Sequence, residues 1–280
     1  MGIINAGTAV GAVAAPPLIV LILMHAHWFE ITSWRWVFFI TGGFGLAWAL
    51  AWSFIYFTPP STDERTGAEP TTPAISVGML VAKKEVRGIV IAKFLSDAAW
   101  YFYLFWLPKY LYDARGFDVK AVGTFAWIPP VAAGVGCLCG GGASSWLLQR
   151  GVSVNRARKI VLGASAFIMP FVLFVPAVPV NWAIALFSLA YFGHQSWSTL
   201  VMILPTDLFP RKVVGAVAGL VGCAGALGGV VFGQAVGYLL DHGFGWGIVF
   251  AVAGSFHVVG FLVICWAIPT IRPCAIANSQ

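Results

Sequence analysis

The sequence predicts an all-α integral membrane protein with eight transmembrane helices, and three observations lead to this fold class. Hydrophobic residues make up 60% of the 280 residues and charged residues only 9%, so a soluble globule would lack the polar residues to cover its surface. Eight apolar stretches approach or exceed the roughly 20 residues that carry a helix across a bilayer. In addition, the segment WRWVFFITGGF at 34–44 recurs as WGIVFAVAGSF at 246–256, which indicates a parallel internal duplication.

The first two spans, predicted at 4–25 and 35–57, make up a first domain of residues 1–57. Met1 is followed by no basic segment, and no small-residue cleavage site separates the two stretches. The first stretch is therefore predicted to be a true span and not a signal peptide.

A flexible linker is predicted at 58–74, where Pro, Thr and acidic residues are frequent and show no periodicity. The segment after it, ISVGMLVAKKEVR, carries apolar residues at helical spacing, which predicts a short amphipathic helix at the inner membrane interface. Those apolar residues are Ile75, Met79, Leu80 and Val86. Residues 58–88 together are interpreted as a central cytoplasmic linker.

The remaining residues, 89–280, are predicted to form a C-terminal six-helix bundle. Its spans are expected at 89–112, 121–148, 159–178, 181–204, 213–240 and 245–268. Prolines that interrupt spans predict kinks, and they are Pro108, Pro129, Pro130 and Pro205. Glycines gathered at 134–142 and 215–233 predict that these two helices approach their neighbours closely.

Basic residues orient the predicted spans in the membrane. With the 58–88 linker inside, the loops on that side carry Arg65, Lys83, Lys84, Arg87, Arg150, Arg156, Arg158, Lys159, Arg211, Lys212 and Arg272. The outer loops carry Arg35, Lys109, Arg115 and Lys120. This asymmetry predicts a cytoplasmic linker by the positive-inside rule, and the net charge of +6 has the same origin.

The repeat also predicts helices that are absent from this sequence. Two spans precede the linker and six follow it, and the first two resemble the last two. We therefore expect a twelve-helix protein of which the fifth to twelfth helices are present and the first four are missing before Met1.

Three segments make the resemblance specific: KFLSDAAWYFYLFWLPKYLYDARGFD, SSWLLQRGVSVNRARK and HQSWSTLVMILPTDLFPRK. With the helical plan, they resemble the major facilitator superfamily, and within it the anion:cation symporter family of hexuronate-transporter type. The resemblance implies a monomeric multi-pass protein of the bacterial inner membrane that takes up a sugar acid with protons by alternating access. The sequence departs from the family because it lacks the first and fourth helices, which supply a basic substrate contact and acidic proton carriers.

Lys93 and Asp97 are the first candidate site, because they lie one turn apart inside a predicted span. If that span begins near Gly88, Lys93 lies about 8 Å deep and Asp97 about 14 Å deep, at 1.5 Å per residue. Ionisable residues at this depth are costly and often mark a transport pathway. Trp100 and Tyr101 follow at further helical steps. We expect Lys93 to bind the substrate, with Asp97 setting its charge or carrying a proton; a purely structural ion pair is the alternative.

A second candidate group lies near the middle of the 181–204 span and contains His194, Gln195, Trp197 and Ser198. An aromatic ring, a hydroxyl and a titratable group together suit a hydroxylated anion, and His194 is a candidate for proton coupling beside Asp97. His257 is also central in its span, but the resemblance places that helix outside the bundle, where packing is the expected role.

The remaining site predictions concern the first span and the inner loops. Asn5 and Thr8 lie one turn apart on a face that borders the cavity in the related family, and a helix-to-helix hydrogen bond is the equal alternative for Asn5. Gating is expected of the inner-loop residues, with Asp207 and Arg211 as a latch to the preceding loop. The gating residues are Arg150, Arg156, Arg158, Asp207 and Arg211.

Other classes of function are disfavoured by the sequence. The chain shows no Ser/His/Asp grouping, no metal-ligand spacing and no phosphate loop, so an enzyme, a metal site and a cofactor are not expected, nor is a nucleic-acid partner. The five cysteines form no CxxC pair and are interpreted as packing residues. Two alternatives stay open: an incomplete, non-functional fragment of a transporter, and a membrane-embedded enzyme or binding subunit.

Overall fold

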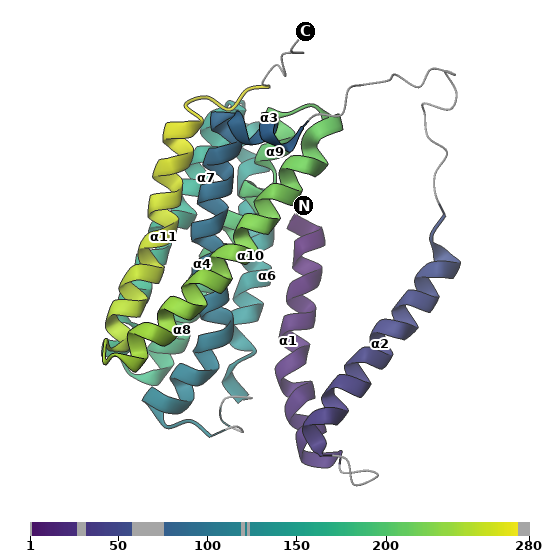
Figure 1. Cartoon of the computed structure of the whole chain (residues 1–280), viewed down its shortest axis with the longest axis vertical. Coiled ribbons are helices and arrows are strands. Elements are labelled where there is room, and N and C mark those ends of the chain that lie inside the picture. Colours follow the sequence, from purple (N-terminus) through teal and green to yellow (C-terminus); the bar gives the residue numbers. More distant parts are fainter. Residues whose placement is uncertain (1, 27–31, 58–75, 119–120, 122–123, 274–280) are drawn as a thin grey trace.

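The computed structural model describes residues 2–26, 32–57, 76–118, 121 and 124–273 (Figure 1). Within these residues every regular element is a helix, which confirms the predicted fold class. The order begins with α1 (Gly2–His25), α2 (Ser33–Ile55), α3 (Val77–Ala82), α4 (Lys84–Arg115) and α6 (Ile128–Gln149). It continues with α7 (Val154–Ile168), the 3₁₀ helix η3 (Met169–Ala177), α8 (Val180–Val201), α9 (Leu204–Leu208), α10 (Arg211–Asp241) and α11 (Trp246–Ala267).

Each of the eight predicted spans corresponds to a long helix, with α7 and η3 together forming one of them. Among the described residues, α2, α4, α6, α7 with η3, α10 and α11 are long and apolar enough to cross a membrane, and α1 contributes a shorter apolar stretch, Val10–His25. The helix α8 is as long as α6 but falls outside this group, because polar side chains such as His194, Gln195 and Ser196 lower its hydropathy.

Helix boundaries follow local chemistry and correct two details of the sequence analysis. Pro129, Pro130 and Pro205 do not interrupt helices. They lie in the first turns of α6 and α9, where a backbone N–H has no acceptor within the helix and proline is tolerated. Of the four prolines, only Pro108 lies in the interior of a helix, α4. The helix predicted after the linker, α3, has six residues and ends before Val86, which belongs to α4. Ile75 lies outside the described residues, and the amphipathic, interfacial character of this helix stays a prediction.

The helices run up and down, so their connections gather at two ends (Figure 1). One end, called the linker end below, holds α3, α9, the start of α7 and the last turn of α11. The basic starts of α4, α7 and α10 also lie there, in agreement with the predicted charge asymmetry; the cytoplasmic orientation stays a prediction. The opposite end holds the end of α1, the start of α2 and the α10–α11 connection.

Two apolar clusters hold the bundle together, one toward each end. The linker-end cluster joins α3, α4, α9 and α10 to the chain after α11, with Leu80, Leu204, Val217 and Ile271 among its members. The opposite cluster is rich in aromatic rings and centres on Phe250, which packs against Phe102, Tyr110 and Phe187 at ring distances of 5.2–5.7 Å. Polar side chains that lie between these clusters are enclosed on both sides.

Glycines allow two helix pairs to approach closely, as the sequence predicted. In α10, a Cβ on Gly225 would collide with the Asp97 carboxylate, and one on Gly228 with the Phe94 carbonyl of α4. In α6, Gly136 and Gly140 lie equally close to the backbone of α8. The buried Asp97 carboxylate of α4 therefore packs directly against Gly225 of α10.

We predict that Gly228→Ala destabilises the protein by about 1–3 kcal/mol, because the added methyl group overpacks the contact with the α4 backbone. Gly222 lies in the same helix, and a methyl group added there would meet nothing within 4 Å, so Gly222→Ala is the matched control and should be neutral or slightly stabilising. Apparent melting temperatures in detergent check both variants. Equal behaviour of the two would contradict the close α4–α10 contact.

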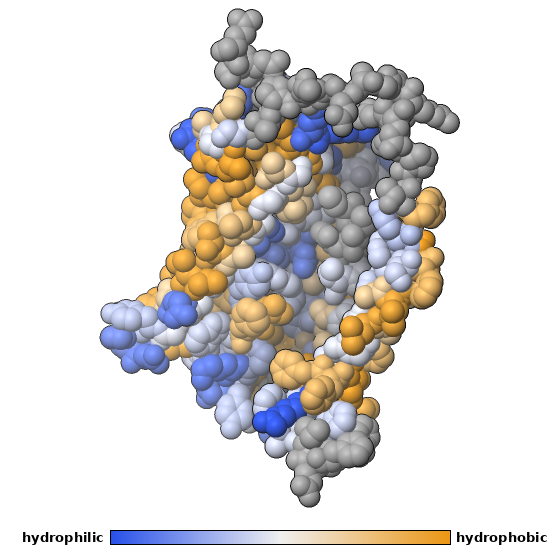
Figure 2. Space-filling view, turned by 45° about the vertical axis from the view of Figure 1, so that its right-hand side comes forward, coloured by the Kyte–Doolittle hydropathy of each residue, from blue (hydrophilic) through white to orange (hydrophobic). Residues whose placement is uncertain are grey.

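The outer flanks of the molecule are apolar. No residue of α2, which the structure describes throughout, is buried, and large side chains such as Phe38, Trp48 and Phe54 are more than half exposed. Figure 2 shows orange, hydrophobic flanks along the bundle and along α2, with hydrophilic residues gathered toward the ends. Such a surface suits hydrocarbon, which agrees with a multi-pass membrane protein.

Candidate functional site

The core of the candidate site is a buried ion pair on α4. The Nζ atom of Lys93 lies 3.0 Å from Oδ1 of Asp97, with side chains only 9% and 13% exposed. The same ammonium donates a hydrogen bond of 2.9 Å to the Ser198 hydroxyl of α8. The pair is local in sequence, one turn apart, but the third partner reaches it only because α4 packs against α8. Three of the predicted site residues therefore meet at one point.

Two histidines extend this polar group toward α11. Nε2 of His194 lies 3.9 Å from Oδ1 of Asp97, and Nδ1 of His194 lies 3.0 Å from Nε2 of His257. Both imidazoles are buried, with 2% and 0% of their surface exposed. A continuous row of polar groups, here called the polar chain, thus runs from Ser198 through Lys93, Asp97 and His194 to His257.

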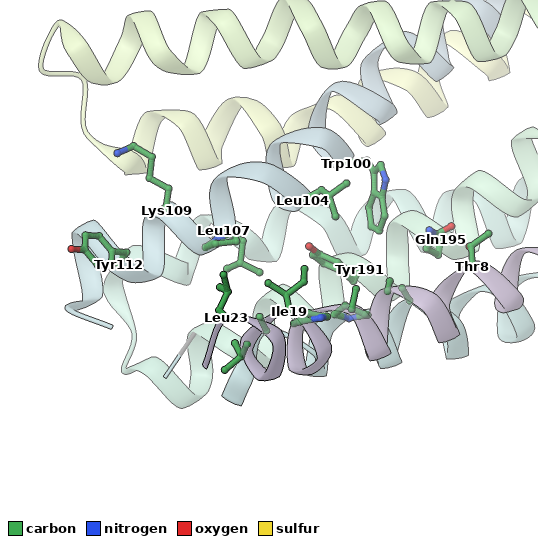
Figure 3. Close-up of a pocket in the computed structure, with 18 of the residues that line it drawn as sticks. Thr8, Ile19, Leu23, Trp100, Leu104, Leu107, Lys109, Tyr112, Tyr191 and Gln195 are labelled. Carbon is green, nitrogen blue, oxygen red and sulfur yellow. The ribbon is translucent and has the colours of Figure 1, made fainter. Parts of the chain in front are cut away.

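A cavity of about 980 Å³ lies beside the polar chain, between α1, α4, α6 and α8. Figure 3 shows Thr8, Trp100 and Gln195 at one end of this cavity and Leu23, Lys109 and Tyr112 at the other. The second group lies near the opposite end of the bundle, where α1 and α4 finish. The cavity therefore extends from the middle of the bundle toward the end away from the linker.

Trp100 separates the cavity from the polar chain. Its indole lines the cavity and stacks on the His194 imidazole, with ring centroids 4.6 Å apart and planes 9° from parallel. Gln195 lines the cavity next to it and accepts a hydrogen bond from the Cys137 thiol at 3.7 Å. Lys93 and Asp97 are not among the residues that line the cavity, and Trp100 follows Lys93 by two helical turns on α4.

Of the other predicted binding residues whose side chains the structure describes, Tyr101 and Trp197 lie apart from the cavity, with Thr8 as the exception. Tyr101 packs over Gly229 of α10 and stacks on Phe105 at 5.8 Å. Trp197 is fully buried against His257, so the indole available to a ligand is that of Trp100. The exception is Thr8, which lines the cavity as expected, whereas Asn5 belongs to α1 but its side chain lies outside the described residues.

A separate charged contact closes the linker end. Nε of Arg158 lies 2.9 Å from Oδ2 of Asp207, and its Nη1 donates a hydrogen bond of 2.7 Å to the Ser144 hydroxyl. This latch ties α6, α7 and α9 together. Asp207 thus pairs with Arg158, while Arg211 is exposed at the start of α10. Arg150 lies over the Trp146 ring at 4.0 Å, and Arg156 is exposed.

His257 and Ser144 are the residues whose place in these groups the sequence did not indicate. His257 is visible in the sequence as an intramembrane histidine, but its contact with His194 depends on packing between residues 63 positions apart. Ser144 lies among small residues of α6 and has no distinguishing sequence signal. Both contacts arise from tertiary structure alone.

Similarity to known proteins identifies the family of this chain. Residues 1–233 match the Major Facilitator Superfamily. The chain belongs to this superfamily. Within it, the chain is 34% identical to the hexuronate transporter of Escherichia coli K12, over 98% of this chain and 65% of that protein. It is also 34% identical to the galacturonate transporter of Dickeya chrysanthemi, over 60% of this chain and 52% of that protein.

A third relative is the D-galactonate transporter of Escherichia coli O6:H1, 28% identical over 94% of this chain and 64% of that protein. The chain thus spans about two thirds or less of the length of these relatives. The similarity confirms the recognition of a major facilitator protein of hexuronate-transporter type. Since the relatives are named transporters, it also confirms that the chain is not an enzyme of the kind left open above.

Proposed function

We propose that this major facilitator protein is a secondary active transporter that carries a sugar acid together with protons across a bacterial inner membrane by alternating access. A hexuronate or a closely related organic anion is the proposed substrate. The observation that carries the proposal is the buried Lys93 ammonium, two helical turns before Trp100, which lines the cavity. The names of the relatives support the same substrate class.

The cavity supplies the first contacts. Its volume of about 980 Å³ is at the upper end of the range for small-molecule sites, about 300–1,000 Å³. A sugar acid that enters from the end away from the linker meets the Trp100 indole, on which a sugar ring can stack, and the Gln195 amide and Thr8 hydroxyl, which hydrogen-bond its hydroxyl groups. These groups suit a polyhydroxylated ring.

Lys93 supplies the charge that an anion needs. In the structure its ammonium is already paired with Asp97, so a substrate carboxylate has to compete with the Asp97 carboxylate. If the substrate takes Lys93, Asp97 becomes a buried carboxylate without its counter-ion, a state that a proton relieves. Binding of the anion and binding of a proton at Asp97 therefore favour each other, which is the thermodynamic requirement of symport.

The test is uptake of labelled glucuronate and galacturonate by proteoliposomes of the purified protein, with and without an imposed pH gradient. Acid outside is expected to accelerate uptake and to drive accumulation above the outside concentration. Uptake that ignores the gradient would replace symport by facilitated diffusion. Failure to take up either sugar acid, with folded protein in the vesicles, would overturn the proposed substrate class.

A further inference from the structure

The polar chain ends at the Nδ1 atom of His257. Nδ1 of His257 is buried and lacks a hydrogen-bond partner within the part of the protein that the structure describes. An unpaired buried nitrogen is costly, by about 1–3 kcal/mol, and such a group in a native structure points to an unseen partner such as water. The other end of the polar chain, at Lys93 and Ser198, is hydrogen-bonded by comparison.

The hydrogen-bonding capacity of neutral imidazole indicates which ring nitrogen of His194 and which of His257 carries the proton. If His194 donated from Nδ1, its Nε2 lone pair would face the Asp97 carboxylate, and two acceptors would oppose each other at 3.9 Å. The other tautomers avoid this: His257 donates from Nε2 to Nδ1 of His194, and His194 carries its proton on Nε2, facing Asp97. The Nδ1 of His257 is then a free lone pair, which agrees with its lack of a partner.

We propose that His257 is the proton-accepting end of a two-histidine relay that protonates Asp97. Nδ1 of His257 takes a proton from a hydronium ion, and His257 passes its Nε2 proton to Nδ1 of His194. His194 passes its Nε2 proton to Asp97 when the 3.9 Å between Nε2 and Oδ1 shortens to hydrogen-bond distance. One proton enters and one arrives at the carboxylate. Each imidazole ends neutral, in its other tautomer, and Asp97 becomes neutral and releases the Lys93 ammonium.

Among the described residues, four charged or titratable side chains meet at the relay, and the other neighbours of these side chains are uncharged. Lys93 and Asp97 reach the site from α4, His194 from α8 and His257 from α11. On the α10 side Gly225 faces Asp97, and the uncharged indoles Trp100 and Trp197 cover the two imidazoles. The neighbouring Cys137 thiol of α6 is engaged with Gln195. Proton movement along the row is therefore the chemistry that this arrangement favours.

This inference rests on the proposed symport, and its test separates the two. His257→Gln keeps an N–H donor for Nδ1 of His194 but cannot pass a proton. In proteoliposomes, we expect acid-driven accumulation of labelled hexuronate to fall at least about tenfold, equivalent to about 1.4 kcal/mol. Counterflow, the exchange of labelled for unlabelled sugar acid at equal pH, should stay within about twofold of the parent because it needs no net proton transfer. His242→Gln, which removes an exposed histidine at the end of α10, is the matched control and should change neither rate.

The outcomes are distinct. Acid-driven accumulation that persists in His257→Gln overturns the relay, and loss of counterflow together with accumulation in folded protein also overturns it, because His257 would then serve binding or packing. A parent protein without acid stimulation removes the proposed symport instead, and NMR then tests the hydrogen-bonded histidine pair on which the relay depends. In protein labelled with ¹⁵N-histidine, His257→Gln should shift the His194 ring signals, and His242→Gln should not. Unchanged His194 signals would overturn the hydrogen-bonded pair.

Discussion

Replacing Lys93 by glutamine is expected to lower hexuronate uptake at limiting substrate by about ten- to a hundredfold. The substitution removes a charge-assisted hydrogen bond to the substrate carboxylate, which is worth about 1.5–3 kcal/mol, while a polar side chain of similar length stays near Ser198. The measurement is the initial rate of labelled glucuronate uptake at concentrations far below KM. Uptake equal to the parent would remove Lys93 from the site.

The same substitution should also destabilise the protein, and this effect identifies the ion pair independently of transport. Lys93→Gln leaves Asp97 buried without its counter-ion, and breaking a buried pair in this way costs about 3–5 kcal/mol. Asp97→Asn should do the same to Lys93. The double variant leaves two neutral amides one turn apart, so its melting temperature in detergent should lie above that of either single variant. A double variant that loses the sum of the two single effects would contradict the pairing.

Arg158→Ala is expected to produce the second large effect, because Arg158 holds the linker end together. The substitution leaves the Asp207 carboxylate and the Ser144 hydroxyl without their partner, and side-chain exposures of 11% for Arg158 and 19% for Asp207 limit compensation by water. We expect a loss of about 3 kcal/mol of stability and a marked decrease in uptake, because the closed linker end becomes less populated.

A matched control for this variant lies two residues away. Arg156 is exposed in the first turn of α7, before Arg158, so Arg156→Ala removes the same charge without breaking the latch and should change stability by less than about 0.5 kcal/mol. Melting temperature and uptake are measured for both variants side by side. If Arg156→Ala is as harmful as Arg158→Ala, the effect comes from net charge in the loop and not from the latch.

The polar chain shows which contacts of the site can be predicted from the sequence and which cannot. Lys93 and Asp97 are predictable as a pair because one helical turn brings them together whatever surrounds the helix. Their contacts with Ser198 and His194 are not, because these depend on the rotation of α8 against α4. Trp197 and Trp100 illustrate the difference: both lie beside a histidine, yet only the Trp100 indole lines the cavity.

The inner loops show the same limit. The sequence predicts that Asp207 and Arg211 latch the preceding loop but does not indicate which residues of that loop they meet, and Pro210 ends the extended connection before α10 begins. Asp207 is thereby left on α9, facing the start of α7, and pairs with Arg158. The backbone conformation at Pro210 follows from the local sequence. Which basic residue lies within reach of Asp207 depends on how α7 packs against α9.

The amino-acid sequence by itself determined the fold class and the order of the spans, because hydrocarbon admits helices whose length and apolar composition can be counted along the chain. It also determined that an ammonium and a carboxylate share one helix turn at membrane depth. Only the tertiary structure decided that Trp100 and Gln195 line the cavity, that Arg158 latches Asp207, and that His257 meets His194. Those contacts join helices that are far apart in the chain. They depend on how each helix is rotated against its neighbours, as in the close glycine contacts of α10 with α4 and of α6 with α8, which composition and periodicity do not specify.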